Sequence, residues 1–504
     1  MTSKFYITTP IYYVNASAHI GHSYTTIAAD TLARYNRNLL GKDKVRFLTG
    51  TDEHGQKIQR AAEKEGLSPQ QFTDKIVPTF KNLWAKLDIS YDDFIRTTEE
   101  RHIRAVQRVL EILHAKNEIY AAQYEGWYCI PCETFWTEMQ LVENACPDCK
   151  RPVEKIQESN YFFKISAYQD WLIDYLKSHL DFIRPASRHE EVCRFLELNK
   201  LTDLCISRPQ ERLGWGIPFS FSPEHVTYVW FDALINYISA VGSFDDKGRY
   251  VSEWWGDDVK VVHLIGKDIL RQHAVYWPII LKALGIRMPD TVFAHGWWML
   301  GEDKMSKSRG NVVSPLEMVD KFGVDVYRYF LLRDVPFGLD GNFSEDALIK
   351  RFNSDLANDL GNLVYRTLTM IEKYYQGNVP QGEFKAADAQ AEAIGVKIAH
   401  LGHRLASNLG AGDYNFSLAL ESIWELINMA NKYVEDSKPW NLSKEGKTEE
   451  LRNFILVLVG VIRKVSAAIA PFMPQAAVSI KEQIGQNEIK KGNPLFPRIE
   501  IKKV

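Results

Sequence analysis

The sequence has no apolar run long enough to cross a membrane and no secretion signal. Its longest candidate for a membrane span lies between Lys464 and Lys481, where 16 uncharged residues include Pro471 and Pro474. This run falls short of the roughly 20 apolar residues that a bilayer needs, so we interpret it as a buried helix and turn. The first residues lack the apolar region of a signal peptide. We therefore expect no membrane partner.

The chain also has few cysteines and no excess of either charge. Six cysteines among 504 residues are too few for a disulfide scaffold, and four of them form two close pairs. This usage favours a reducing compartment, so we expect a cytoplasmic protein. The 61 basic residues oppose 64 acidic ones, for a net charge of −3. A nucleic-acid partner would therefore have to be met by a local basic face.

What is present is an ordinary globular composition, with 45% apolar, 12% aromatic and 25% charged residues. The length suggests about three domains. Residues 5–9 form a β-rich run, a helical stripe begins at Ala28, and residues 45–49 form a second β-rich run. This order is typical of the βαβ unit of a parallel nucleotide-binding sheet.

The predicted sheet resumes late in the chain. Residues 259–265 and 291–294 are apolar runs typical of buried parallel strands, and the roughly 110 residues before them, with paired cysteines and aromatic clusters, resemble an inserted module. After Ser344 helical stripes dominate. We predict an α/β fold, in which a Rossmann-like parallel-sheet domain is interrupted by a zinc-knuckle insertion and followed by an α-helical bundle. The expected parts are residues 1–115, 116–224, 225–345 and 346–504.

Two C-x-x-C pairs predict a metal site in the insertion. Cys129 and Cys132 are separated by 13 residues from Cys146 and Cys149, a spacing suited to one tetrahedral Cys₄ zinc ion. Two disulfides or a redox dithiol are the alternatives, but neither suits a cytoplasmic chain without a thioredoxin-like context. Four thiolates leave no position for water or substrate, so the zinc should be structural. Cys193 and Cys205 are interpreted as core or free thiols.

A histidine-glycine-histidine sequence follows the first predicted strand. His19, Gly21 and His22 stand where a helix begins, and the free backbone N–H groups of a helix N-terminus favour a phosphate. Two imidazoles can donate further hydrogen bonds to a phosphate chain, and Gly21 allows a purine to approach closely. Taken alone, the same residues are equally consistent with an ordinary capped helix.

A second sequence, residues 304–308, follows the last predicted strand. Lys304 and Lys307 make it a cationic loop, and most such lysine-serine pentamers are solvated loops. Opposite a helix N-terminus, however, two ammonium groups can neutralise the charge that develops as a triphosphate reacts. The two sequences together therefore favour a nucleotide-activating enzyme.

Together, these two stretches resemble the two signatures of class I aminoacyl-tRNA synthetases, in the order that the class requires. Residues 10–15, 50–55, 228–233, 265–268 and 362–366 are similar to the methionyl-tRNA synthetase family within that class. The resemblance implies that Asp52 receives the substrate ammonium and that the methionine side chain lies in a largely aromatic pocket. The implied pocket residues are Ile11, Tyr13, Trp230, Leu234, Tyr237, His273 and Trp277. Aromatic rings suit a polarizable thioether, although without the resemblance such residues would be assigned to the core.

The resemblance also implies sites for ATP and tRNA. His19, Gly21, His22, Lys304 and Lys307 would bind ATP together with Mg²⁺, which shares the phosphate charge. Gly296 and Trp297 would border the adenine. Asn362, Arg366 and Trp440 would read the anticodon, because single-stranded bases are recognised by stacking and by hydrogen bonds. By themselves, Arg366 is more typical of a solvated helix face and Trp440 of a core.

The implied reaction has two steps, the formation of methionyl-adenylate with release of pyrophosphate and the transfer of the methionyl group to the 3′ end of initiator or elongator tRNA. We expect a monomer. A synthetase for leucine, isoleucine or valine is an alternative, but those enzymes carry a larger hydrolytic insertion than the roughly 110 residues available here. A catalytically silent tRNA-binding paralogue would have damaged signatures. A simple nucleotidyltransferase would lack the knuckle and the bundle.

Overall fold

The computed structural model describes residues 3–15, 17–130, 134–136, 138–300, 303–304, 313–410 and 412–500. Its contacts divide the chain into two compact units. The first comprises Met1–Ala85 and Ile89–His295, and the second comprises Lys86–Asp88 and Gly296–Val504. Each unit is described by itself below.

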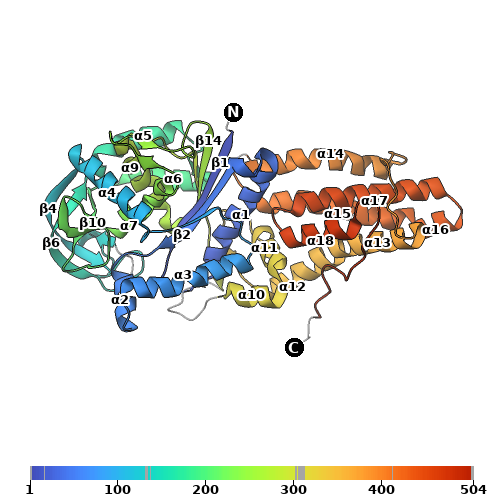
Figure 1. The fold of residues 1–504 in the computed structure, drawn as a ribbon, viewed down its shortest axis with the longest axis horizontal. Helices are drawn as coiled ribbons and strands as arrows, with labels where there is room; N and C mark the ends of the chain where they lie inside the picture. The colour runs from blue at the N-terminus through green and yellow to red at the C-terminus, as the bar shows by residue number, and fades with distance from the viewer. Residues whose placement is uncertain are drawn as a thin grey trace. The chain divides into compact units, whose positions relative to one another are not determined.

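The first unit is built on a six-stranded sheet in which every pairing is parallel (Figure 1). In sheet order, the strands are β3 (Asp93–Arg96), β2 (Val45–Asp52), β1 (Lys4–Tyr13), β14 (Val259–Gly266), β15 (Thr291–His295) and β7 (Ile183–Arg184). The N-terminal strand β1 lies between β2 and β14, so the strand order reverses on its two sides. Ligands of such sheets bind beyond the carboxyl ends of the strands, at the point of reversal. The predicted parallel α/β sheet is confirmed.

Helices pack around this sheet. They are α1 (Ile20–Leu40), α2 (Gln56–Lys64), α3 (Pro69–Lys86), α4 (Glu100–Ala115), α5 (Gln169–Ser178), α6 (Ala186–Leu198), α7 (Val229–Leu234), α8 (Asn236–Ser239), the π-helix η5 (Gln272–Tyr276) and α9 (Trp277–Leu284). Pro69 begins α3, and the helix continues through Pro78. An interior proline costs about 3 kcal/mol, and burial of Phe80, Leu83 and Trp84 on the same helix outweighs that cost.

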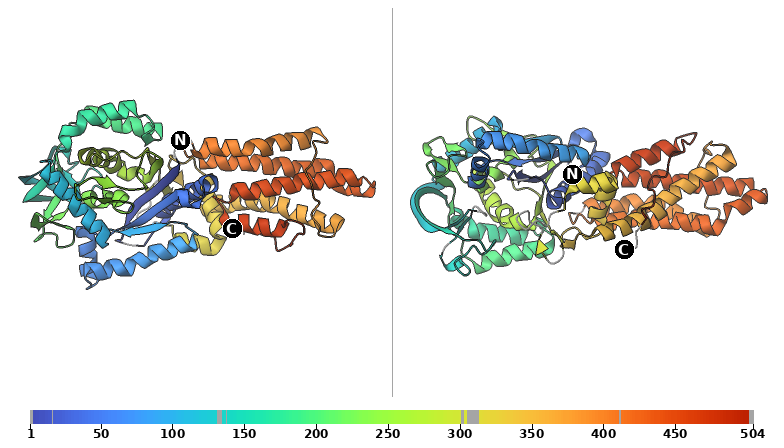
Figure 2. Two further views of the ribbon diagram at one scale, coloured as in Figure 1. Left: turned by 45° about the horizontal axis from the view of Figure 1, so that its top comes forward. Right: turned by 90° about the horizontal axis from the view of Figure 1, so that it is seen from below.

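The insertion is mainly antiparallel. One sheet has the order β5 (Thr134–Trp136), β4 (Ile119–Cys129), β6 (Glu154–Phe163) and β8 (Leu204–Cys205), and a second has the order β10 (Pro218–Phe219), β11 (Ser222–Thr227) and β9 (Ser207–Pro209). The long pairing of β4 with β6 begins at Ile119 and Phe163 and ends at Tyr128 and Glu154. Both views in Figure 2 place the cyan strands β4 and β6 at one end of the first unit. The short hairpin of β12 (Ser243–Phe244) and β13 (Tyr250–Val251) follows.

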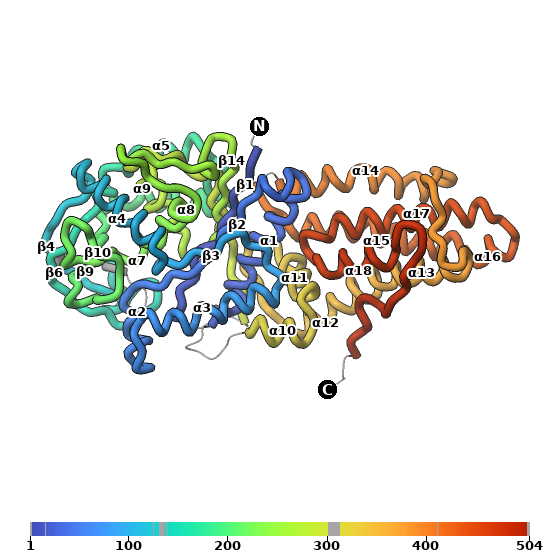
Figure 3. The backbone as a smooth tube through the Cα atoms, viewed as in Figure 1, coloured from blue at the N-terminus to red at the C-terminus, as the bar shows by residue number. Residues whose placement is uncertain are grey.

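The second unit is mainly helical, and its long helices lie side by side (Figure 3). They are α10 (Pro315–Phe322), α11 (Val324–Arg333), α12 (Glu345–Arg351), the π-helix η7 (Phe352–Gly361), α13 (Asn362–Tyr375), α14 (Ala389–Gly410), α15 (Phe416–Ser437), α16 (Pro439–Lys444), α17 (Thr448–Ile469) and α18 (Pro474–Ile484). A small sheet is formed by β16 (Trp298–Leu300) and β17 (Asp303–Lys304), which precede these helices, and by β18 (Gly341–Asn342), which lies between α11 and α12 in the chain. The predicted helical bundle is confirmed.

The apolar stripes that predicted these helices form the core of the bundle. Leu356, Leu363 and Ile371 are fully buried, as are Ile423 and Ile427 on α15. The run after Lys464 consists of the end of α17, a short turn and the start of α18, as expected of a buried helix and turn. Among the helices that the structure describes, none is long and apolar enough to span a membrane.

Candidate functional site

The residues expected to bind an amino acid come from six elements of the first unit. Ile11 and Tyr13 lie on β1, Asp52 ends β2, Trp230 and Leu234 lie on α7, Tyr237 lies on α8, His273 lies on η5, and Trp277 begins α9. Tyr13 is the register partner of Asp52 at the carboxyl end of the two strands. β2 meets β3 closely at Gly50, where a Cβ atom would lie only 2.0 Å from the Ile95 carbonyl oxygen. Glycine is therefore required there.

Tyr237 and His273 form the centre of this cluster. The tyrosine hydroxyl lies 2.7 Å from Nε2 of His273, and Nδ1 of the same ring lies 2.8 Å from the carbonyl oxygen of Ile269. Burial lowers the pKa of His273 to about 4, although the Ile269 carbonyl and Asp268 oppose this shift. The ring is therefore neutral at pH 7. Because a carbonyl only accepts, Nδ1 carries the hydrogen, and Tyr237 donates to Nε2.

His263 is part of the same cluster, although the sequence analysis did not select it. Its ring stacks on Tyr237 with 4.1 Å between centroids, and its Nε2 accepts a hydrogen bond from the indole N–H of Trp277 at 3.3 Å. Its Nδ1 then donates to the Thr8 hydroxyl at 2.8 Å. Burial, together with His273, lowers the pKa of His263 well below its usual value. A histidine inside the apolar run 259–265 was the signal that could have revealed it.

The loop after β2 directly follows Asp52, the last residue of the strand, and is held mainly by residues from distant parts of the chain. Glu53 is fully buried and accepts two hydrogen bonds from Arg96, at 2.7 and 2.8 Å, and one from Thr51 at 2.6 Å. Trp215, from the insertion, donates its indole N–H to the Glu53 carbonyl and accepts from the Gly55 N–H. The backbone on both sides of the predicted ammonium-binding residue is therefore fixed.

A second buried group was also missed by the sequence analysis. The Asp232 carboxylate, on α7, lies 2.7 Å from Nδ1 of His54 and 2.7 Å from Nε2 of His102. Burial alone would raise the pKa of this carboxyl, but the two imidazoles outweigh burial and lower it. Asp232 is therefore ionised and accepts from both rings. Only the fold brings these groups together, because Asp232 and His54 are 178 residues apart in the chain.

The predicted phosphate-binding histidines lie at the N-terminus of α1. His19 is the N-cap residue, and its Nδ1 accepts a hydrogen bond from the Gly21 N–H at 3.1 Å. Nδ1 of His22 accepts in turn from the His19 N–H at 3.0 Å. A neutral imidazole whose Nδ1 accepts carries its hydrogen on Nε2. Each ring therefore caps the helix with one nitrogen and has a donor on the other.

Gly21 has a local reason to be glycine. A Cβ atom at this position would lie 3.0 Å from the His19 ring, which is tighter than ordinary packing. The side chain of residue 21 is therefore limited by the capping histidine itself. The expected close approach of a purine at this glycine stays a prediction.

The remaining residues predicted to bind ATP belong to the second unit. A Cβ atom on Gly296 would lie 2.3 Å from the backbone of Leu339, and the Trp297 N–H donates to the Asp340 carboxylate at 2.8 Å. The backbone of Lys304, in β17, pairs with that of Met299, in β16. Lys307 and the rest of that signature lie outside the described residues.

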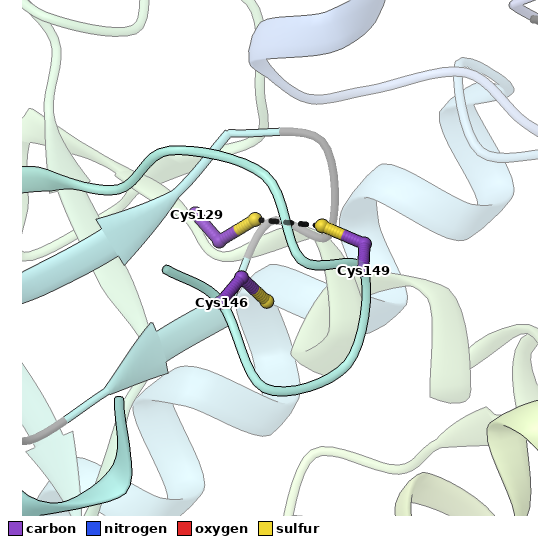
Figure 4. A group of neighbouring side chains, drawn as sticks. All are labelled: Cys129, Cys146 and Cys149. Atoms are coloured by element: carbon purple, nitrogen blue, oxygen red, sulfur yellow. Dashed lines mark hydrogen bonds between the residues drawn. The ribbon is translucent and has the colours of Figure 1, made fainter. Parts of the chain in front are cut away.

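Three of the four predicted zinc ligands lie together in the insertion (Figure 4). The Sγ atoms of Cys129, Cys146 and Cys149 all lie within 4.8 Å of one another, and those of Cys129 and Cys149 are 3.5 Å apart. Four thiolates bound to zinc at about 2.3 Å would place their sulfurs roughly 3.8 Å apart. The three cysteines therefore fit a metal ion, and Cys132 lies outside the described residues.

The other two cysteines are not part of this cluster. Cys205 is buried and Cys193 is partly buried, and neither forms a disulfide within the described chain. Burial raises the pKa of the Cys205 thiol to about 11, so it stays protonated. Both agree with their interpretation as core or free thiols.

The predicted anticodon-reading residues lie on two helices of the second unit. Asn362 and Arg366 are one turn apart on α13, directly after the π-helix η7. Trp440, on α16, is 43% exposed, so it is not a core residue. Trp424 and Asn431 of α15 donate to the carbonyls of Asp355 and Asp359 on η7.

These two bonds set the direction of the helices. The residue numbers increase in the same direction on the two helices, from Trp424 and Asp355 to Asn431 and Asp359, so α15 and η7 run side by side in the same direction. The end of α15, and with it α16, therefore lies toward the part of α13 that carries Arg366. The helix turns in η7 are widened, and a Cβ atom on Gly361 would lie 2.9 Å from the Leu356 carbonyl oxygen. Such π-helical segments are frequent at functional sites.

A parallel sheet with a histidine-capped helix at its point of reversal is the architecture of a nucleotide-binding domain, and comparison with known proteins specifies the class. The family model of class I tRNA synthetases (M) matches residues 5–155 and 152–368. The catalytic fold is thus that of a class I tRNA synthetase. Within this class, the chain belongs to the methionyl-tRNA synthetase family.

Curated relatives and a solved structure agree with this assignment. The methionine–tRNA ligase of Caldanaerobacter subterraneus is 48% identical over 524 residues, which cover 100% of this chain and 80% of the relative. That of Fusobacterium nucleatum is 46% identical and covers 100% of this chain and 81% of the relative. The Mycobacterium tuberculosis methionyl-tRNA synthetase in complex with methionyl-adenylate has a TM-score of 0.91 and 38% identity, covering 98% of this chain and 100% of that one.

Proposed function

We propose that this protein ligates methionine to tRNA. The methionine carboxylate attacks the α-phosphate of ATP to form methionyl-adenylate and pyrophosphate, and a ribose hydroxyl at the 3′ end of methionine tRNA then takes the methionyl group and releases AMP. The observation that carries the proposal is the buried cluster of Tyr237, His273 and Trp277 in a chain whose relatives are methionine–tRNA ligases along its whole length.

The cluster suits the side chain of methionine. Its two histidines are neutral, so the wall that they form with Tyr237 and Trp277 presents rings and no formal charge. Sulfur-to-ring contacts are worth roughly 0.3 to 1.5 kcal/mol each, and the shape of an aromatic box would favour methionine over shorter apolar side chains. Asp52 would receive the substrate ammonium at the carboxyl end of β2, and the remaining walls would come from Ile11, Tyr13, Trp230 and Leu234.

The ATP site would be assembled from both signatures. The Nε2–H groups of His19 and His22 would donate to the phosphates, and Gly21 would allow the purine to approach. Lys304 and Lys307 would neutralise the departing pyrophosphate, with Mg²⁺ sharing that charge. Gly296 and Trp297 would border the adenine. No side chain needs to become covalent, so catalysis would depend on positioning and charge stabilisation.

One structural zinc ion would be held by Cys129, Cys132, Cys146 and Cys149. Four thiolates complete its tetrahedral shell, so the metal stabilises the insertion and takes no part in the reaction. Among the described ligands, Cys129 ends β4, and Cys146 and Cys149 belong to the tight turn in which the Lys150 N–H donates to the Cys146 carbonyl. Without a metal the thiolates would repel one another in this small buried cluster.

The bundle would read the tRNA anticodon. Asn362 and Arg366 offer hydrogen bonds on one helical turn, and the exposed ring of Trp440 offers a surface on which a base can stack. The proposed division of the chain places this domain at residues 346–504, after the catalytic halves at 1–115 and 225–345 and the insertion at 116–224. We propose further that the protein acts as a cytoplasmic monomer on initiator and elongator tRNA.

Exchange of pyrophosphate into ATP tests the proposal. The purified protein should support exchange with methionine and not with leucine, isoleucine or valine at equal concentration. It should then charge methionine tRNA in the presence of zinc and Mg²⁺. Faster exchange with leucine or isoleucine than with methionine would overturn the assignment of substrate.

A further inference from the structure

The Asp232 carboxylate joins three segments of the first unit. His54 belongs to the loop after β2, His102 lies on α4, and Asp232 lies on α7. All three side chains are buried, Asp232 and His102 completely. Nδ1 of His102 also lies 2.8 Å from the Ser239 hydroxyl, so the chain of hydrogen bonds extends to α8. A buried carboxylate with two donors is a rigid joint, because breaking either bond leaves a desolvated charge.

The loop that the joint holds directly follows Asp52, the last residue of β2. His54 follows Asp52 by two residues, and its ring also packs on Trp215 at 5.3 Å between centroids. The contacts of Glu53 fix the loop to Arg96 and to Trp215. The bond from His54 to Asp232, in contrast, ties the loop directly to α7.

The helix on the other side of the joint carries Trp230. Asp232 follows Trp230 by two residues within α7, and its own N–H is held by the Tyr228 carbonyl at 3.0 Å. The joint therefore connects the residue proposed to bind the substrate ammonium with a residue proposed to contact the substrate side chain.

We propose that Asp232 is a positioning residue for methionine. Its carboxylate holds His54 and thereby fixes the spacing between Asp52 and Trp230, so that the ammonium and the side chain of one methionine are bound at once. The inference rests on the proposed function, which assigns both groups to the amino acid. Sites that bind two ends of a small ligand lose affinity when their supporting contacts are removed, even though those contacts never touch the ligand.

The first test compares two substitutions of the carboxylate itself. Asp232→Ala should raise the KM for methionine in pyrophosphate exchange by about ten- to a hundredfold, because a misplacement of a binding group by about 1 Å can cost as much as a hundredfold. The KM for ATP and the kcat should change by less than about threefold. Asp232→Asn should restore most of the methionine affinity. Its carbonyl can accept from His54, and its amide can donate to His102, whose Nδ1 then donates to Ser239.

The second test separates positioning from stability. His54→Phe and His102→Phe each remove one donor from the same carboxylate, so both should lower the melting temperature by similar amounts. Only His54→Phe releases the Asp52 loop, and only it should raise the KM for methionine about tenfold or more. His102→Phe is the matched control, with a KM within about threefold of the wild type. If Asp232→Ala does not fold, the comparison of His54→Phe with His102→Phe still tests whether Asp232 positions the methionine site.

The outcomes distinguish the inference from the proposed function. If the wild-type protein shows no methionine-dependent exchange, the proposed function is wrong and the inference is lost with it. If the wild type exchanges normally but His54→Phe and Asp232→Ala leave the KM for methionine unchanged, the inference alone is wrong. Equal increases in the KM for methionine in the two phenylalanine variants would also overturn it, because the bond from His54 to the loop after Asp52 would then matter no more for methionine binding than the bond from His102.

Discussion

The two units present their proposed binding residues in opposite ways. In the first unit, Tyr237, His273 and Trp277 are buried and hold one another in place through hydrogen bonds and ring contacts. In the second unit, Trp440 is 43% exposed on a short helix, and Asn362 is exposed on α13. A small ligand binds in a site that encloses most of its surface, whereas the splayed bases of an RNA loop can be bound by side chains on an open surface.

This difference has an energetic consequence. Removing a group from the buried site leaves its partners unsatisfied, so binding and stability change together. Removing an exposed side chain from the bundle costs little stability, so its effect on binding stands alone. A substitution in the site of the first unit should therefore lower both activity and melting temperature, whereas a substitution of an exposed residue in the second unit should lower activity alone.

The largest effect is expected from a residue that acts only during the chemical step. Lys307→Ala should slow methionine-dependent pyrophosphate exchange by about a hundred- to a thousandfold, the cost of losing one group that stabilises developing charge. The KM for methionine should change little, because the buried pocket is untouched. Steady-state exchange at varied methionine and ATP measures both quantities. Equal losses in kcat and in methionine affinity would contradict a role in the transition state.

A substitution in the bundle should affect the charging of tRNA and not pyrophosphate exchange. Trp440→Ala should reduce the charging of methionine tRNA by about ten- to a hundredfold, since stacking of one base is worth roughly 1 to 3 kcal/mol. Pyrophosphate exchange needs no tRNA and should be unchanged. The melting temperature should also be preserved, because the ring is 43% exposed.

Trp424 is the matched control for this substitution. It lies in the same bundle but is only 5% exposed, and its indole N–H donates to the Asp355 carbonyl. Trp424→Ala should cost about 3 to 5 kcal/mol of stability, as a core tryptophan does. If Trp440→Ala lowered the melting temperature as Trp424→Ala does, its loss of charging would reflect unfolding and not the reading of a base.

The sequence predicted the repeating parts of this fold well. Apolar stripes at helical spacing, such as Leu356, Leu363 and Ile371, indicated the bundle because burial follows the period of the helix. Apolar runs such as 259–265 and 291–294 indicated parallel strands, since both faces of such a sheet are covered. The position of His19 before a helical stripe indicated a helix start, and His19 is the N-cap of α1.

The buried polar contacts could not be predicted in the same way. Asp232 meets His54 across 178 residues and His102 across 130, and no local pattern reports such a pairing. His263 and Thr8 meet across 255 residues, where β14 pairs with β1. These contacts depend on the order of strands in the sheet, which local periodicity does not specify. The aromatic pocket was predicted only because of the family resemblance, and its individual residues stay predictions.

A third prediction tests whether stability of the first unit depends on its insertion. Cys146→Ser should lower zinc content below one ion per chain and lower the melting temperature, because a closed thiolate site contributes directly to folding. Exchange activity should fall less than stability, since the knuckle supplies no catalytic group. Metal analysis and thermal unfolding of the variant measure these effects. Cys193→Ser is the control, because that thiol lies apart from the cluster and should leave zinc content unchanged.

The smallest effect expected is a pH dependence that arises from the buried histidines of the first unit. The pKa of His273 is about 4 in the folded protein and roughly 6.5 in an unfolded chain. The unfolded state therefore binds a proton first as the pH falls. The stability contributed by the neutral ring is fully present above pH 6.5 and is lost progressively toward pH 4.

For His273 alone, the loss between pH 7 and pH 5 amounts to about 2 kcal/mol, and His263 adds to it in the same direction. His273→Gln removes one titrating group, so the melting temperature of this variant should fall less between pH 7 and pH 5 than that of the wild type. His403→Gln is the control in the bundle, because it makes the same replacement at an exposed histidine of α14. Parallel pH profiles for wild type and His273→Gln would mean that folding does not lower the pKa of His273, and the inference that burial keeps this ring neutral at acidic pH would be wrong.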